Sequence, residues 1–373
     1  MAQTAVVRPE LDARKSSSYM PTLDGWRAIS ILAVMIHHDF IHRMTGMSTL
    51  WFFEHGKVGV DVFFAISGIL ICSRLLDEEQ RFGSISLLQF YIRRAFRIIP
   101  PAILYLLVIA LLSALAIIPR VGMDWFGALF FFRNYTRLLG HHVVDGSWFT
   151  GHFWSLSVEE HFYLLLPAIL VLTHRKHRIK VLSALILLVA GNLVFQLNHR
   201  PWDQILYHTD TRLDSLFIPA LMAILIRRDP LRVNFARSQH LWPLMIAVLF
   251  AFVTWMPRNF CYALTMAVLV PVLVLSTVIN SQSILGRFLE LPPLRYIGRI
   301  SYSLYLWQQL FLVGHLVVYF QASDITLGPL QHAPLNYIAT FVCAVASYYL
   351  LEKPAMRFGH QLATRIQRPA LTQ

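Results

Sequence analysis

The chain has 373 residues, of which 56% are hydrophobic and only 14% are charged. Soluble domains carry about 25% charged residues, so this composition excludes an ordinary soluble protein and indicates a polytopic membrane protein. The formal net charge of +12 does not require a nucleic acid, because basic residues of membrane proteins collect in cytoplasmic loops. We therefore expect a lipid bilayer around the chain and no nucleic-acid partner.

Ten apolar segments follow a polar N-terminal stretch and predict an all-α transmembrane bundle of about ten spans. Several of them are shorter than the roughly 20 residues of an ideal span, so their ends are soft. The segments are 22–42, 58–74, 98–118, 152–173, 180–198, 213–226, 241–256, 260–279, 301–320 and 334–351.

The positions of the basic residues predict the orientation. If the N-terminus lies in the cytoplasm, most of the 32 Lys and Arg residues fall into cytoplasmic loops, as basic residues do in membrane proteins. We therefore expect both termini in the cytoplasm. The expected domains are a cytoplasmic tail over 1–19, a transmembrane domain over 20–355 and a second tail over 356–373.

The first segment, GWRAISILAVMIHH, carries Arg27 near its start and His38 near its end. On a helix these two residues are separated by roughly 16 Å. With Arg27 at the cytoplasmic face of a hydrocarbon core about 30 Å thick, His38 would lie near mid-depth. An ionisable side chain there indicates a functional site, and a histidine hydrogen-bonded inside the bundle is the other interpretation.

The second segment, beginning GKVGVDVFFAISG, places Asp61 near the outer face. Gly59 and Gly68 are small residues that allow neighbouring helices to approach closely. Asp61 either has a direct role or belongs to the bundle's structure.

Before the third segment, YIRRAFRIIPP puts Arg94 and Arg97 three residues apart, on one helix face. Arginine makes forked contacts with phosphates, so the pair is a candidate anion site. The alternative is topogenic charge that reaches the lipid headgroups. We expect the Pro100–Pro101 pair to fix the helix start.

The fourth segment, GHFWSLSVEEHFYLLLP, carries Glu159 and Glu160 in the outer half of the membrane. Because a carboxylate is costly in lipid, at least one must face a polar interior, where it either acts in the site or pairs with an arginine. Arg212 and Asp214, at the outer end of the sixth segment, are a candidate site or a surface pair of little energetic value.

Seven pieces of the chain, taken together, resemble acyltransferase family 3, a family of integral membrane acyltransferases. They occur in the family's order and cover about residues 20 to 355. The pieces are LDGWRAISILAVMIHH, GVDVFFAISGILI, YIRRAFRIIPP, WSLSVEEHFYLLLP, RLDSLFIPAL, ISYSLYLWQQLF and LEKP.

The resemblance implies transfer of an acyl group, most often acetyl, from cytoplasmic acyl-coenzyme A to a hydroxyl of a saccharide or glycolipid acceptor, in the bacterial cytoplasmic (inner) membrane and without a metal. Its motifs fall on Arg27 with His38, on Arg94 with Arg97, and on Glu159. Many relatives have a histidine where this chain has Gln308, so no catalytic role is expected for that position.

The resulting hypothesis divides the candidate residues into three roles. His38 acts as general base or as transient nucleophile, oriented by Glu159 in the way an acid orients the histidine of a catalytic triad. The coenzyme A phosphates bind Arg27, Arg94 and Arg97, and the acceptor binds Asp61, Arg212 and Asp214. The competing class is a glycolipid or polysaccharide-precursor transporter, which often shows an internal repeat that is not apparent here.

Overall fold

The computed structural model describes residues 19–39, 58–139, 147–205, 207–227, 241–255, 260–313 and 327–367. These residues form helices and no strands, which confirms the all-α prediction. The ends of the two predicted tails, 1–18 and 368–373, lie outside the described residues.

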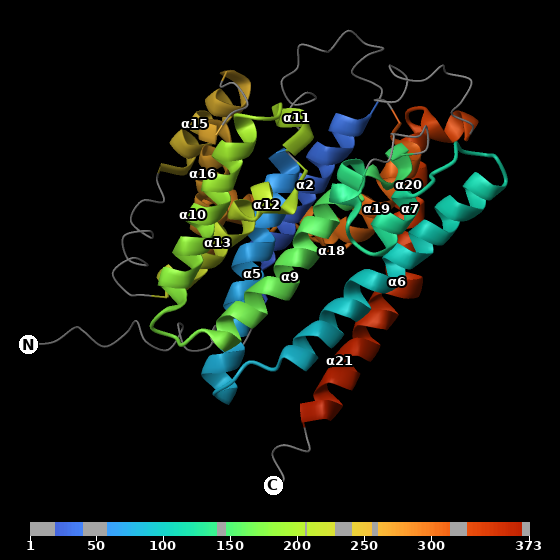
Figure 1. Ribbon diagram of the computed structural model, residues 1–373. Helices are drawn as coiled ribbons and strands as arrows, with labels where there is room; N and C mark the ends of the chain where they lie inside the picture. The colour runs from blue at the N-terminus through green and yellow to red at the C-terminus, as the bar shows by residue number, and fades with distance from the viewer. Residues whose placement is uncertain are drawn as a thin grey trace, which may run out of the picture.

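The helices follow one another with short connections (Figure 1). The first half of the chain forms α2 (Pro21–His38), α5 (Val58–Phe82), α6 (Leu87–Ala114), α7 (Asp124–Leu129), η3 (Arg133–Leu139), α8 (Trp148–Gly151), α9 (Phe153–Leu172) and α10 (Arg178–Leu197). The second half forms α11 (Trp202–Ile205), α12 (Thr209–Arg212), α13 (Asp214–Leu225), α15 (Trp242–Trp255), α16 (Phe260–Ile279), α17 (Ile284–Leu289), α18 (Pro292–Arg299), α19 (Ser301–Phe311), η8 (Gly328–Gln331), α20 (Leu335–Ser347), η9 (Tyr348–Glu352) and α21 (Lys353–Gln367).

Six helical stretches among the described residues are long and apolar enough to cross a membrane, so the chain is a multi-pass membrane protein. They are Val58–Phe82, Leu87–Ala114, Trp148–Leu172, Arg178–Leu197, Phe260–Ile279 and Leu335–Ile366. The other four predicted spans correspond to shorter helices, namely α2, α13, α15 and α19. The count of ten spans and the cytoplasmic position of both termini therefore stay predictions.

The start of α6 differs from the prediction. The helix begins at Leu87, after Ser86 accepts the backbone N–H of Gln89, and Pro100 and Pro101 lie in its interior. The proline pair therefore does not fix the helix start, because the capping serine provides that signal 14 residues earlier. As a result the two arginines of YIRRAFR lie within a continuous helix, on one face as predicted.

Close helix packing around α5 depends on its glycines, as predicted. A Cβ at Gly59 would lie 2.5 Å from the carbonyl oxygen of Ser30 on α2, and one at Gly68 would lie 2.5 Å from that of Leu216 on α13. Since a side chain at either position would clash with backbone, these glycines hold α2 and α13 directly against α5. This packing brings Arg27 and Ser67 to one pocket.

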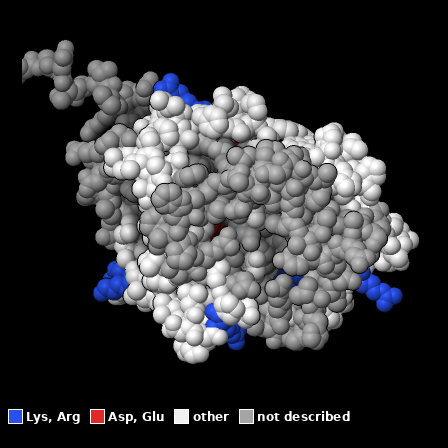
Figure 2. Space-filling model, turned by 90° about the horizontal axis from the view of Figure 1, so that it is seen from above, with Lys and Arg blue, Asp and Glu red and all other residues white. Residues whose placement is uncertain are grey.

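The C-terminal helix α21 packs along α6 at the lower right of Figure 1, where the rings of Phe96 and Phe358 lie 5.3 Å apart. The predicted C-terminal tail over 356–373 thus begins inside a packed helix. Figure 2 looks onto the opposite, upper end of the bundle, where the visible described surface is mostly uncharged and the Lys and Arg side chains lie at the periphery.

Candidate active site

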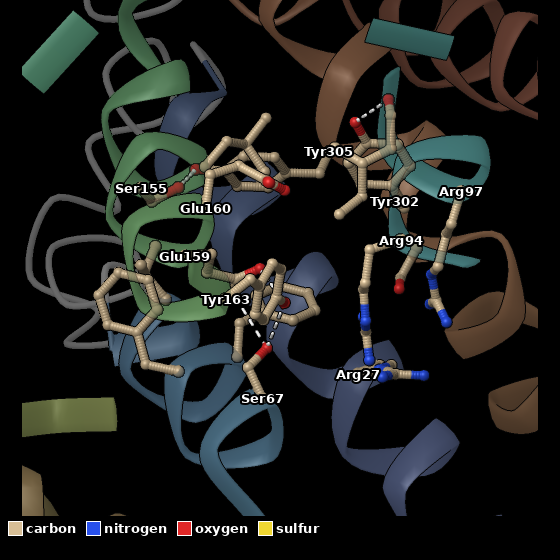
Figure 3. Close-up of a pocket in the computed structure, with 16 residues that line it drawn as sticks. Arg27, Ser67, Arg94, Arg97, Ser155, Glu159, Glu160, Tyr163, Tyr302 and Tyr305 are labelled. Atoms are coloured by element: carbon tan, nitrogen blue, oxygen red, sulfur yellow. Dashed lines mark hydrogen bonds between the residues drawn. The ribbon is translucent and has the colours of Figure 1, made fainter. Parts of the chain in front are cut away.

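A pocket inside the bundle gathers four of the sequence-predicted site residues (Figure 3). Arg27 reaches it from α2, Arg94 and Arg97 from α6, and Glu159 from α9, while α5 and α19 complete the wall. The pocket encloses about 720 Å³ of empty space, part of it open to solvent. This size lies within the roughly 300–1,000 Å³ of small-molecule sites.

Glu159 is held on the acidic side of this pocket by two hydroxyl groups. Ser67 donates to Oε1 at 3.0 Å and Tyr163 donates to Oε2 at 2.8 Å. Both carboxylate oxygens therefore have a fixed partner, and Glu160 lines the same pocket one residue on. The sequence reasoning treated Ser67 only as a small packing residue and passed over Tyr163.

The basic side of the pocket is formed by arginines that lack acidic partners. The guanidinium of Arg94 lies over the ring of Tyr163, 4.8 Å from its centroid. Among the described residues neither Arg94 nor Arg97 forms an ion pair, whereas Arg27 contacts Asp24 at 3.5 Å. Since an anionic ligand would neutralise such a group of cations, the arrangement favours binding of a phosphate-bearing molecule.

A second pocket adjoins the first and extends the basic surface. Arg94 and Arg97 line both, and the second adds Arg74 and Arg93 around about 790 Å³ of empty space. Its one acidic lining residue is Glu78, which pairs with Arg93 at 3.0 Å. The sequence reasoning missed Arg74, although it follows Ser67 by seven residues, two turns along one helix face.

His38 lies apart from Glu159 and has a different partner. Its Nδ1 is 2.9 Å from Oε1 of Gln308, and its ring meets the edge of Trp148 at 5.3 Å. Because Trp148 precedes Glu159 by eleven residues, the two levels are separated by roughly 16 Å along α8 and α9. The predicted orientation of His38 by Glu159 is therefore not what the structure shows.

The pocket nevertheless extends toward His38. Tyr305 lines it and lies on α19 three residues before Gln308, so the two share a helix face. One helical turn thus separates the far wall of the pocket from the partner of His38.

Asp61 and Arg212 form an ion pair that is buried rather than on the surface. Their side chains are 12% and 7% exposed, and the guanidinium also lies over Phe64, 5.7 Å from the ring centroid. Asp214, two residues from Arg212, is buried and accepts the backbone N–H of Ser215 at 2.7 Å. The Nε of Arg212 has no hydrogen-bond partner among the described residues, so one donor of this cluster remains available to a ligand.

No metal is needed to explain these contacts. In the described part of the chain, no group of three or more His, Cys, Asp or Glu side chains could hold a metal ion. The chemistry that the described residues offer is anion binding by arginine, hydrogen bonding by carboxylate and hydroxyl groups, and proton transfer by imidazole.

Comparison with known proteins agrees with these features. The model of the family described as "Acyltransferase domain" matches residues 20–352. The O-acetyltransferase OatA of Staphylococcus aureus strain NCTC 8325 / PS 47 is 29% identical over 94% of this chain, which covers 59% of that relative, and OatA of strain COL gives the same values. The chain therefore spans about three fifths of the length of these relatives. No solved structure matches it. With a family model covering nearly all of the described bundle, the chain belongs to the acyltransferase domain family.

Proposed function

We propose that this domain transfers an acyl group, acetyl in the simplest case, from cytoplasmic acyl-coenzyme A to a hydroxyl of a saccharide or glycolipid acceptor in a bacterial cytoplasmic membrane. The observation that carries the proposal is the paired pocket whose arginines Arg74, Arg94 and Arg97 have no acidic partner among the described residues. The printed names of the relatives, O-acetyltransferase, support acetyl as the group and oxygen as the acceptor atom.

The donor's phosphates would bind at the second pocket, where the arginines present several forked donors. The thioester arm would then extend through the first pocket toward His38. The roughly 16 Å of α2 between Arg27 and His38 leaves space for this arm. Glu159, Ser67 and Tyr163 would contact the arm along its route, which replaces the predicted contact of Glu159 with His38.

The chemical step is proton transfer by His38. Its neutral imidazole takes the proton of the acceptor hydroxyl while the new C–O bond forms at the thioester carbonyl. The C–S bond then breaks, and the proton passes from the imidazole to the leaving sulfur, so no separate acyl-enzyme is required. General base catalysis of this kind contributes about 10²–10⁴-fold. The acceptor would enter beside Asp61, Arg212 and Asp214.

The test uses the full chain purified in detergent, acetyl-coenzyme A and a panel of saccharide and glycolipid acceptors, with release of free thiol and acylation of the acceptor measured together. We expect His38→Ala to lower kcat by about 100-fold or more. Arg94→Ala should raise the KM for the donor by about 10- to 100-fold, because a hydrogen bond to a charged group is worth about 1.5–3 kcal/mol.

Arg175→Ala is the matched control, because Arg175 is a 62% exposed arginine that pairs with Glu79. It should leave both constants unchanged. Full activity of His38→Ala would refute the chemistry, and an unchanged KM in Arg94→Ala would refute the donor site. Absence of turnover with every acceptor would return the transporter as the better explanation.

A further inference from the structure

Two adjacent glutamines, Gln308 and Gln309, lie in the centre of the bundle and have no part in the mechanism above. Their exposed fractions are 0% and 2%. A buried side-chain amide is costly unless its hydrogen bonds are satisfied. The bonds that satisfy these two amides form one connected path, and that path ends at His38.

The path begins at a backbone carbonyl, which can only accept. The amide nitrogen of Gln309 donates to the carbonyl oxygen of Trp148 at 2.9 Å, so the amide oxygen of Gln309 faces the other way. The amide nitrogen of Gln308 donates to that oxygen at 3.2 Å. The amide oxygen of Gln308 is then left to face Nδ1 of His38 at 2.9 Å.

This order determines the state of the imidazole. Amide orientations and histidine tautomers follow from the hydrogen-bond network around them, and here the network is anchored at a group whose role cannot change. Because the amide oxygen of Gln308 only accepts, Nδ1 of His38 must carry the proton. In the neutral ring Nε2 then holds the lone pair.

We propose that Gln308, held in place by Gln309 and the Trp148 carbonyl, is a positioning residue that fixes His38 as the Nδ1–H tautomer and so makes Nε2 the proton-accepting nitrogen. The tautomer assignment stands on the hydrogen bonds alone, whereas its catalytic meaning rests on the proposed function. Gln308 takes the place that the sequence reasoning assigned to Glu159.

The support around the relay is rigid. The indole N–H of Trp148 donates to the backbone oxygen of Gln309 at 3.0 Å, so two hydrogen bonds join Trp148 to Gln309. The Trp148 ring also meets His38 edge-on. If this anchor were lost, the Gln308 amide could rotate and present its NH₂ group to Nδ1, which would favour the tautomer with the proton on Nε2.

The kinetic test compares three relay variants with a matched control. Gln308→Leu removes the acceptor, so we expect kcat to fall by about 10- to 100-fold with little change in the donor KM; a wrong tautomer costs up to about 10⁴-fold in a catalytic triad. Gln308→Glu keeps an acceptor for Nδ1–H and should restore most of the lost kcat. Gln309→Leu, which unties the amide but keeps Gln308, should give an intermediate loss.

Gln331→Leu is the control, because Gln331 is a buried amide that bonds the Leu310 carbonyl and is 3% exposed. It should change kcat by less than any relay variant. If Gln308 served packing alone, leucine would be tolerated and a buried glutamate would be the more damaging change. A wild-type kcat in Gln308→Leu, or a kcat in Gln308→Glu no higher than in Gln308→Leu, therefore overturns the proposal.

A second measurement does not depend on turnover. Nitrogen-15 spectra of histidine-labelled protein, with the His38→Ala spectrum subtracted, report which ring nitrogen of His38 is protonated. We expect the Nδ1–H signature in the wild type and its loss in Gln308→Leu and Gln309→Leu, and an Nε2–H signature in the wild type refutes the relay. An inactive wild type with the Nδ1–H signature would instead refute only the proposed function.

Discussion

Replacing Arg212 with glutamine should destabilise the bundle more than replacing Asp61 with asparagine. The side chains of this ion pair are only 7% and 12% exposed, and the carboxylate of Asp214 lies close enough to act on Arg212 as well. Arg212→Gln therefore leaves two buried carboxylates without their cation. Asp61→Asn leaves the cation with one remaining carboxylate, which is the smaller electrostatic fault.

The expected magnitudes follow from the burial. Removing one partner of a buried pair costs about 3–5 kcal/mol, so we place Arg212→Gln at the upper end and Asp61→Asn at the lower end of this range. The double variant Asp61→Asn/Arg212→Gln has two neutral amides in place of the pair. It should be more stable than the sum of the single changes predicts, by about 2 kcal/mol.

The assay is a double-mutant cycle on thermal unfolding of the detergent-purified protein. The surface pair Asp77–Arg227 is the matched control, because its side chains are 36% and 33% exposed and such pairs couple by about 1 kcal/mol or less. A coupling at Asp61–Arg212 no larger than in this control would refute the reasoning. A double variant that is stable but does not acylate its acceptor would support the acceptor-binding role of the cluster.

Three further variants test other parts of the structure. Arg74→Ala should raise the donor KM about tenfold with little effect on kcat, and an unchanged KM in a donor titration would remove Arg74 from the donor site. Gly59→Leu should lower the thermal midpoint by an amount equivalent to at least about 1–3 kcal/mol, because its side chain meets the backbone of α2; Gly191→Leu, with open space around it, should not. Burial lowers the pKa of His208, whose ring stacks on Tyr135 at 5.2 Å. Its contribution to stability is therefore present above the unfolded pKa of about 6.5 and is lost as pH falls toward the lower folded pKa. His208→Phe keeps the stack without the titration, so its melting temperature should fall less than that of the wild type between about pH 7 and pH 5, and an equal fall in both would contradict this assignment.

Much of the fold could be predicted from local patterns. The all-α class follows from the apolar segments, and the shared face of Arg94 and Arg97 follows from a spacing of three within one helix. The close packing of α5 followed from Gly59 and Gly68, since small residues permit it wherever helices cross. Each of these features depends on residues that lie near one another in the chain.

Local patterns also misled where two signals competed. Pro100 and Pro101 were expected to begin a helix, but Ser86 begins it and the prolines lie inside. Arg212 was weighed as a surface residue because it lies at the end of an apolar segment. Its burial results from packing against α5, whose Asp61 is 151 residues away in the sequence.

The sequence by itself determined which residues carry charge and hydrogen-bonding capacity, and which of them share a helix. Only the tertiary structure decided which partners meet, because contacts between helices depend on how the helices cross and slide. His38 meets Gln308, 270 residues away, while Glu159 meets Ser67 and Tyr163. A difference in level of roughly 16 Å along α8 and α9 separates two side chains that motif spacing alone had paired.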